Sequence, residues 1–335
     1  MRLPSEEIKK IIIFRALQLG DMLCVIPAVR ALRRAYPSAE ITLCSLPWAK
    51  SLLERFPEYF DHFVEFPGYP GLPEQDLNPV KFTVFLASVQ AEKFDLALQM
   101  QGNGSVINPM VELFGAKYTA GFYIEGHYYP KNELFLEYPD EGSEINRHLL
   151  LMNHLGIQSQ GNYLEFPLRE SDQAEFDNLD LPLEPQRYIC IHPGSRGAWR
   201  QWPVENFAAL ADYCYESGFT PVITGTKEEL NIAEAVKAHM KNEPLMVVGK
   251  TSLGAVGILL KNAYALISNC TGVSHMASAF KTKSIVISMD GEPERWAPIN
   301  RELHYVIDWT QEPDFDKVAG WLCDLVNGKV TSISS

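Results

Sequence analysis

The sequence predicts an α/β protein with two Rossmann-like, doubly wound parallel-sheet domains that face each other across a cleft. In each half of the chain a short apolar run, at residues 10–14 and 188–192, leads into a glycine-containing turn and then a helix. Strand and helix patterns alternate along both halves, which is typical of a parallel sheet with helices on both faces. Such sheets bind ligands at the carboxyl ends of their strands, so two such edges predict a reaction between the domains.

The first half shows clear strand patterns and one clear helix. Strands are predicted at residues 10–14, 40–46 and 94–99. A helix is predicted over 21–36, where apolar residues recur at helical spacing, and Pro27 either kinks it or opens a second helix. Residues 66–79 are rich in proline and glycine and predict a long loop. Residues 122–147 are aromatic and polar without a clear period, and long irregular stretches of this kind are often functional.

The second half repeats the alternation after a linker. Strands are predicted at 188–192, 220–224, 245–248, 264–268 and 284–288, and helices at 204–217, 227–241, 252–261, 272–280 and 313–327. The linker is predicted within 167–187, around an acidic helix at 170–179. We therefore expect an N-terminal domain over 1–168, a C-terminal domain over 186–312, and a helical segment over 313–335 able to pack back on the N-terminal domain.

Length and composition favour an ordered two-domain protein and disfavour several other classes. The chain has 335 residues, of which 46% are hydrophobic and 21% charged, and this supports normal cores. The formal net charge of −13 disfavours a general nucleic-acid binder, although a few gathered cations can still bind an anionic ligand. The six cysteines form no C-x-x-C pair, which disfavours a zinc site and fits reduced thiols in the cytoplasm.

The distribution of polar and apolar residues also predicts a cytoplasmic protein. Residues 1–10 are polar and charged, unlike a signal peptide. Because no apolar run reaches about 18 residues, we expect no membrane span and at most peripheral contact with the inner face of a membrane. Residues 314–316 have the D-x-D pattern but open a helix instead of following a strand, so no metal site is expected.

Asp21 is the first candidate for chemistry. It follows Gly20, which permits a tight turn, and it opens a helix at the edge of the predicted sheet. Aspartate is a favoured N-cap residue, and a helix N-terminus lowers the pKa of a carboxylate. The same position would let the carboxylate act as a general base in the cleft. The two roles are compatible, and the local pattern leaves both open.

The turn after residues 188–192 predicts an anion site. Gly194 and Ser195 offer backbone amides and a hydroxyl to phosphate oxygens. Arg196 and Arg200 add guanidinium groups, whose geometry suits phosphate. The alternative is an ordinary strand-to-helix turn with surface arginines.

Two further turns are expected beside it on the same sheet edge. The free amides near Thr271 and Gly272, where a helix begins, form a second anion cradle. Thr226 and Lys227 follow another strand and are candidates for contact with a ribose or a phosphate. Thr226 and Glu229 also have the spacing of a capping box, which we expect for Glu229.

Taken together, these segments resemble the ADP-heptose:lipopolysaccharide heptosyltransferase family of glycosyltransferases over nearly the whole chain. The resemblance rests on five ordered segments: Arg15 with Gly20-Asp21 and Pro27; Leu98-Gln99-Met100-Gln101-Gly102-Asn103; His192-Pro193-Gly194-Ser195 with Trp202-Pro203; Asn269-Cys270-Thr271-Gly272 with His275; and Asp290-Gly291-Glu292-Pro293-Glu294-Arg295-Trp296. Each segment is a weak signal alone, and five in the right order are fairly specific.

The resemblance implies a GT-B fold, in which the N-terminal domain receives the acceptor and the C-terminal domain holds a nucleotide-sugar. It implies an inverting, metal-independent transfer of a sugar, by default heptose from ADP-heptose, to a glycan or lipid-linked glycan such as the lipopolysaccharide core. Asp21 would deprotonate the acceptor hydroxyl. The nucleotide-sugar is a substrate, and no cofactor is implied.

The resemblance and the local patterns together place candidate residues on both sides of the cleft. The donor-side candidates are Ser195, Arg196, Arg200, Thr226, Thr271, Gly272 and His275, and the acceptor-side candidates are Arg15, Gln101 and Asn103. The family usually has an aspartate where this chain has Cys270, and a thiol accepts hydrogen bonds poorly, so the donor stays open. A nucleotide-sugar epimerase and a non-catalytic nucleotide-sugar binding protein are the alternatives, because fold alone does not decide function.

Overall fold

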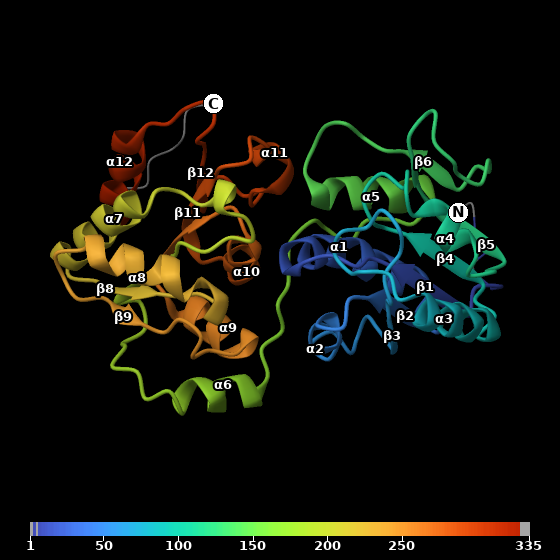
Figure 1. The fold of residues 1–335 in the computed structure, drawn as a ribbon, viewed down its shortest axis with the longest axis horizontal. Coiled ribbons are helices and arrows are strands. Elements are labelled where there is room, and N and C mark those ends of the chain that lie inside the picture. Colours follow the sequence, from blue (N-terminus) through green and yellow to red (C-terminus); the bar gives the residue numbers. More distant parts are fainter. Residues whose placement is uncertain (1–2, 5, 329–335) are drawn as a thin grey trace. The chain divides into compact units, whose positions relative to one another are not determined.

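The computed structural model describes residues 3–4 and 6–328, and the chain forms two compact units, Met1–Tyr163 and Leu164–Ser335. The chain leaves the first unit between Tyr163 and Leu164, a few residues before the predicted linker. Residues 329–335, which end the predicted C-terminal segment, lie outside the described residues. Each unit has its own sheet and its own flanking helices (Figure 1).

The first unit is built on a parallel sheet. Its strands are β1 (Lys10–Phe14), β2 (Glu40–Ser45), β3 (His62–Glu65), β4 (Leu96–Gln99), β5 (Tyr118–Tyr123) and β6 (Phe135–Glu137), and its helices are α1 (Leu19–Ala35), α2 (Ala49–Leu53), α3 (Pro79–Ala91), α4 (Asn108–Glu112) and α5 (Glu144–His154). The six strands lie in the order β3-β2-β1-β4-β5-β6, with every neighbouring pair parallel. Ile11 to Phe14 of β1 are fully buried, as a continuous apolar run predicts for a central parallel strand.

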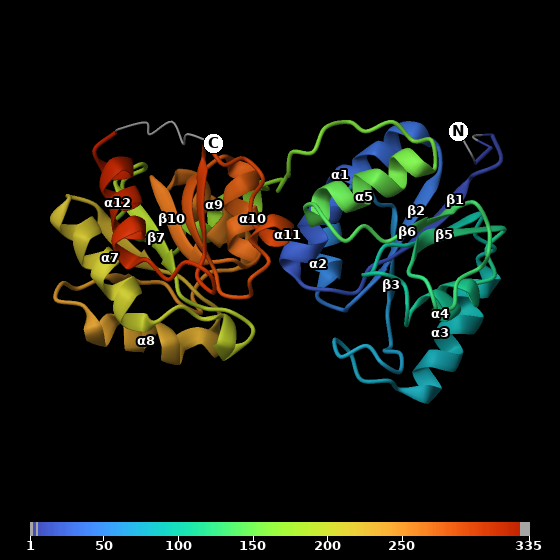
Figure 2. The ribbon, with the colours of Figure 1, turned by 90° about the horizontal axis from the view of Figure 1, so that it is seen from above.

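Helices cover both faces of this sheet (Figure 2). α1 and α5 pack against each other on one face, and α3 and α4 lie on the other. Ile12 and Phe14 of β1 join Phe85 of α3 and Met110 of α4 in one apolar core. Full burial of a side chain of this size contributes about 1.5–3 kcal/mol to stability. α1 continues through Pro27, so no second helix begins there.

The second unit repeats this architecture. Its strands are β7 (Tyr188–His192), β8 (Thr220–Ile223), β9 (Leu245–Met246), β10 (Ala265–Asn269), β11 (Lys283–Ser288) and β12 (His304–Asp308), and its helices are α6 (Glu170–Asp177), α7 (Val204–Glu216), α8 (Leu230–His239), α9 (Leu253–Asn262), α10 (Gly272–Phe280), α11 (Pro293–Trp296) and α12 (Phe315–Val326), with 3₁₀ turns at Ala198–Arg200 and Lys227–Glu229. The strands lie in the order β12-β11-β10-β7-β8-β9, and all neighbouring pairs are parallel.

The apolar core of the second unit lies between its sheet and α7, α8 and α12. Val318, Leu322 and Leu325 of α12 are buried in this core, and α12 contacts α7 and β11. The buried face of the C-terminal helix is therefore used within the second unit, although the sequence suggested that it could pack back on the first. The linker helix α6 packs against α9, so the linker also belongs to the second unit.

No helix in the described part of the chain is both long enough and apolar enough to cross a lipid bilayer.

Candidate functional site

In both sheets the strand order reverses beside the first strand of the unit. β1 lies between β2 and β4, and β7 lies between β8 and β10. Adjacent loops at such a switch point diverge to opposite faces of the sheet, and they leave a crevice where ligands of doubly wound folds bind. The segments that carry most of the predicted site residues directly follow β1, β4, β7 and β10. Each unit therefore presents one candidate site, which is described here by itself.

Asp21 lies in the first turn of α1, next to the end of β1. Gln18 is the N-cap of this helix, so Asp21 is the third helical residue and not the cap predicted from the sequence. Its Oδ2 atom accepts a hydrogen bond from the Gln18 backbone amide at 3.3 Å, so the carboxylate still contributes to capping. The side chain is 23% exposed, which leaves its carboxylate accessible from outside. The Asp21 carboxylate therefore both caps the helix and remains accessible.

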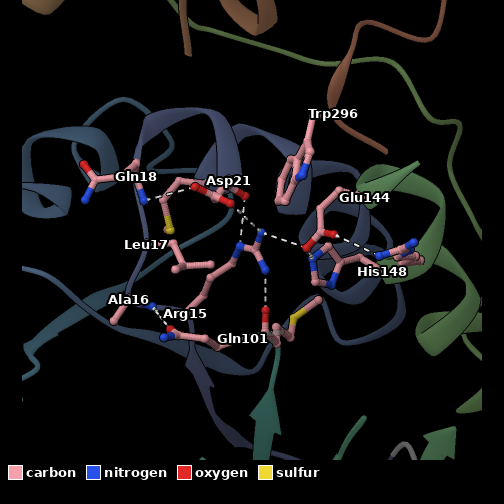
Figure 3. A network of polar contacts seen from close by, with 12 residues as sticks. Arg15, Ala16, Leu17, Gln18, Asp21, Gln101, Glu144, His148 and Trp296 are labelled. Carbon is pink, nitrogen blue, oxygen red and sulfur yellow. Dashed lines mark hydrogen bonds and ion pairs between the residues drawn. The ribbon is translucent and has the colours of Figure 1, made fainter. Parts of the chain in front are cut away.

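Arg15 links this carboxylate to the rest of the unit (Figure 3). Its side chain is fully buried, and its Nε donates to the Asp21 carbonyl oxygen at 2.9 Å. Nη1 donates to the carbonyl oxygen of Met100, after β4. Nη2 lies 3.3 Å from Oε1 of Glu144 and 3.9 Å from Oδ1 of Asp21. One guanidinium group therefore lies between two carboxylates and also joins the loops after β1 and β4.

The electrostatic environment of Asp21 favours a base. Burial raises the pKa of Asp21, while the Arg15 charge lowers it and the Glu144 charge raises it. The sequence predicted the opposite direction, because a helix N-terminus lowers a carboxylate pKa. Desolvation outweighs that effect here. A carboxylate with a raised pKa is a stronger proton acceptor near neutral pH.

The three predicted acceptor-side residues differ in their exposure. Arg15 is completely buried and contacts Asp21, so its side chain is not available for direct contact with an acceptor. Gln101 is also buried, and its Oε1 accepts a hydrogen bond from the Ala16 amide at 2.6 Å, which holds the turn after β1. Asn103 is partly exposed, and its Oδ1 accepts from the Ser105 amide at 3.1 Å. Of the three, only Asn103 is partly exposed, so it stays a candidate for direct contact with a ligand.

In the second unit, Asn269 joins the two turns that the sequence placed on one sheet edge. Asn269 ends β10, and its Nδ2 donates to the carbonyl oxygens of Pro193 at 2.7 Å and Gly194 at 3.3 Å. Its Oδ1 accepts from the Trp202 amide at 3.0 Å. The turn after β7 is therefore tied to the end of β10. This brings Ser195, which is buried, to the same edge as the start of α10.

Arg200 already has a partner in this structure. It forms an ion pair with Asp290, and its Nη2 lies 3.5 Å from the carbonyl oxygen of Cys270. Asp290 follows β11, and its Oδ1 accepts from the Ser288 hydroxyl at 2.7 Å. Burial raises the pKa of the Cys270 thiol to about 12, so the thiol is neutral and the acid beside Arg200 is Asp290. Arg196, by contrast, is exposed.

Glu229 lies over the turn that was predicted to hold phosphate. A Cβ atom added to Gly194 would come within 2.2 Å of the Glu229 carboxyl group, so a larger residue at 194 would displace this carboxyl group from the turn. Oε2 of Glu229 lies 3.8 Å from Nε2 of His192 and accepts from the Thr226 amide at 2.8 Å. The predicted capping box is thereby confirmed. Burial lowers the pKa of His192, against the raising effect of Glu229, so the imidazole is neutral near pH 7.

The remaining donor-side candidates lie around the same edge. Thr226 is exposed at the turn after β8. Thr271 is the N-cap residue of α10, and Gly272 is its first helical residue, both partly exposed. His275 lies one turn further along α10 and is buried. Within residues 3–4 and 6–328, no group of three or more His, Cys, Asp or Glu side chains is placed to hold a metal ion.

Three acidic residues of these sites were not assigned a site role from the sequence: Glu144, Glu229 and Asp290. Glu229 was read as a helix cap only, and it is one, yet its carboxylate also covers the Gly194 turn. Asp290 comes just after an apolar strand, and Asp21 comes after the turn that follows such a strand. This position could have identified Asp290 as a site candidate from the sequence. Glu144 lies at the start of a helix within a stretch that showed no period, so the sequence offered little to single it out.

Comparison with known proteins decides the family. A family model described as glycosyltransferase family 9 (heptosyltransferase) matches residues 84–320. The chain belongs to this family. Lipooligosaccharide heptosyltransferase 2 of Haemophilus ducreyi is 22% identical over 310 residues, which cover 88% of this chain and 87% of that relative. Lipopolysaccharide heptosyltransferase 2 of Escherichia coli K12 is 22% identical over 311 residues, which cover 89% of this chain and 87% of that relative.

Solved structures share the fold of this family 9 glycosyltransferase. A glycosyltransferase family 9 structure from Veillonella parvula has a TM-score of 0.76 at 18% identity and covers 99% of this chain and 93% of its own. The Escherichia coli ADP-heptose lipopolysaccharide heptosyltransferase II has a TM-score of 0.74 at 19% identity and covers 97% of this chain and 100% of its own. The predicted GT-B fold class is thereby confirmed, while the cleft between the domains stays a prediction.

Proposed function

We propose that this glycosyltransferase moves heptose from ADP-heptose to a lipopolysaccharide-core type of acceptor, with inversion and without a metal ion. The observation that carries the proposal is the accessible carboxylate of Asp21, whose pKa is raised, at the switch point of the first sheet. The second sheet offers amides, a hydroxyl and a guanidinium group at the equivalent edge. The named relatives are heptosyltransferases, and one related structure is of an ADP-heptose enzyme.

In the proposed reaction Asp21 is the catalytic base. An acceptor hydroxyl attacks the anomeric carbon as its proton passes to the Asp21 carboxylate. The bond between that carbon and the diphosphate oxygen breaks, and its electron pair leaves with the nucleoside diphosphate. One displacement on the face opposite the leaving group inverts the anomeric centre. The transition state carries developing charge on the departing oxygen, which the donor-side groups have to stabilise.

The donor-side residues divide between phosphate and hydroxyl recognition. Arg200, Ser195 and the first amides of α10 at Thr271 and Gly272 suit phosphate oxygens, and fixed donors of this kind stabilise charge without reorganisation. The Glu229 carboxylate repels phosphate and accepts hydrogen bonds from hydroxyls. We therefore assign the part of the site beside Glu229 to the ribose or the sugar. His275 supports α10 from a buried position, and exposed Arg196 and Thr226 are outer contacts.

The absence of a metal requirement is part of the proposal and rests on the sequence. No D-x-D motif follows a strand, and cationic side chains with helix amides can take over the stabilisation of the leaving diphosphate. We place the enzyme in the cytoplasm, with at most peripheral contact with the inner face of the membrane when the acceptor is lipid-linked. Nucleic acid is not a proposed partner.

Transfer with purified protein tests the proposal. The protein is incubated with ADP-heptose and a heptose-free lipopolysaccharide core acceptor, and the product is followed by mass spectrometry and by the anomeric configuration of the new bond. Asp21→Asn keeps the size of the side chain and removes the base, so transfer should fall about 10²- to 10⁴-fold while ADP binding is retained. Transfer should also survive chelation by EDTA.

Each alternative has its own signature in this experiment. An altered sugar nucleotide formed without acceptor would identify an epimerase. Tight ADP-heptose binding without transfer or donor hydrolysis would identify a binding protein. Full turnover by Asp21→Asn would exclude Asp21 as the base, and loss of turnover in EDTA would exclude the metal-independent reaction.

A further inference from the structure

Arg15 is shared between two carboxylates that come from different helices. Asp21 lies in the first turn of α1, and Glu144 is the first residue of α5, positioned by the Ser143 cap. α1 and α5 pack against each other along one face of the sheet. The Arg15 guanidinium lies closer to Glu144, at 3.3 Å, than to the Asp21 carboxylate, at 3.9 Å (Figure 3). The cation is therefore engaged more strongly by the buried acid than by the accessible one.

Glu144 is held firmly in this position. Its side chain is only 2% exposed, whereas that of Asp21 is 23% exposed. Among the described residues, the charged and titratable groups near Glu144 include Arg15 after β1, Asp21 on α1, Tyr138 before α5, and Arg147 and His148 on α5 itself. The Tyr138 hydroxyl donates a hydrogen bond to Oε2 of Glu144 at 3.4 Å. Nη1 of Arg147 lies 3.9 Å from Oε2, and Nε2 of His148 lies 3.3 Å from Oε1.

We propose that Glu144 is a positioning residue that holds the Arg15 guanidinium away from the Asp21 carboxylate and so keeps Asp21 free to accept the acceptor proton. Without the Glu144 charge, Arg15 would be a buried cation whose nearest anion is Asp21. Asp21 would then turn toward it, because an unpaired buried charge is costly. The tighter ion pair would favour the ionised form of Asp21 and make it a weaker base. This inference rests on the proposed role of Asp21.

Neutralising Glu144 without changing its size is the direct test. In Glu144→Gln, the acidic limb of the plot of kcat against pH should move to lower pH by about one unit, because Arg15 then acts on Asp21 alone. kcat at neutral pH should fall several-fold, and by no more than about tenfold, as the base weakens, while KM for the nucleotide-sugar stays unchanged. A merely structural role would lower the amount of folded protein but would leave the acidic limb in place. An unshifted limb in folded Glu144→Gln would overturn the proposal.

Two further variants keep the test decisive. Asp212→Asn also neutralises a buried acid, but in the second unit, and it should leave the limb unchanged. If Glu144→Gln does not fold, the double variant Arg15→Gln with Glu144→Gln removes both buried charges together. Because Asp21 then loses its neighbouring cation, the acidic limb of kcat should move to higher pH than in the wild type. An acidic limb that stays in place or moves to lower pH would overturn the proposal. Loss of turnover in Asp21→Asn with an unmoved limb in Glu144→Gln would leave the proposed function intact and remove only this inference.

Discussion

His304 is a buried titratable residue to which we assign no role in the chemistry. It begins β12, and its Nδ1 lies 2.8 Å from the Ser284 hydroxyl oxygen. Burial, with smaller effects from Arg301 and His275, lowers the pKa of His304 to about 4 from 6.5. The folded state therefore holds the imidazole neutral at pH values where the unfolded chain would protonate it.

This shift makes stability depend on pH in a defined window. The folded pKa lies below the unfolded one, so the contribution is fully present above pH 6.5 and is lost as the pH falls toward 4. A shift of this size corresponds to about 3 kcal/mol. The free energy of unfolding, measured with urea at pH 7.5, 5.5 and 4.5, should decline less with falling pH in His304→Asn than in the wild type. The asparagine side chain cannot take up the proton. Equal declines would show that His304 does not carry this dependence.

At the scale of elements, Asp212 of α7 forms hydrogen bonds with the backbone just after the end of α8. Its carboxylate accepts hydrogen bonds from the backbone amides of Lys241, at 2.9 Å, and Asn242, at 2.9 Å. Asp212→Ala leaves these amides without an acceptor and should lower the free energy of unfolding by about 2 kcal/mol. Asp177→Ala removes an exposed carboxylate of α6 and should change it by less than about 0.5 kcal/mol. Urea denaturation compares the two, and equal effects would contradict this role of Asp212.

Elements with a strong local signal were predictable, and those fixed by distant contacts were not. The strands at 10–14 and 188–192 have the predicted ends, because continuous apolar runs bounded by turns leave little choice. The Thr226–Glu229 capping box is local chemistry and was also predictable. The short edge strand β6 and helix α5 lie in or beside the aperiodic stretch 122–147, where packing on α1 and β5 decides the structure.

The candidate sites show the same division between local and distant information. Asp21, Ser195 and Thr271 follow strands that end in turns, and parallel topology brings such positions to one edge of a sheet. Glu144 acts on Arg15 across 129 positions of sequence, and Asp290 acts on Arg200 across 90. A single sequence contains no signal for such pairs, because they depend on which strands become neighbours. The pKa direction of Asp21 was missed for the same reason, since it depends on burial.

At the scale of the whole molecule, each unit has its own sheet, core and switch point, and the proposed chemistry divides between them. Donor recognition should therefore be separable from base catalysis. A ligand that binds only the folded protein raises its melting temperature with concentration, and it contributes about 2.7 kcal/mol at one hundred times its Kd. A thermal-shift screen with ADP-, GDP-, UDP- and dTDP-sugars should show the largest rise with the ADP-sugar.

Variants from the two units should then respond differently to the same nucleotide. Arg200→Gln removes the guanidinium proposed to hold the diphosphate and should abolish most of the ADP-dependent rise in melting temperature. Arg187→Gln removes an exposed arginine just before β7, at the opposite end of the strand, and should retain the rise. Asp21→Asn changes only the first unit, so it should also retain the rise although it no longer transfers sugar. Loss of the ADP response in Asp21→Asn, or its full retention in Arg200→Gln, would contradict this division of labour between the two units.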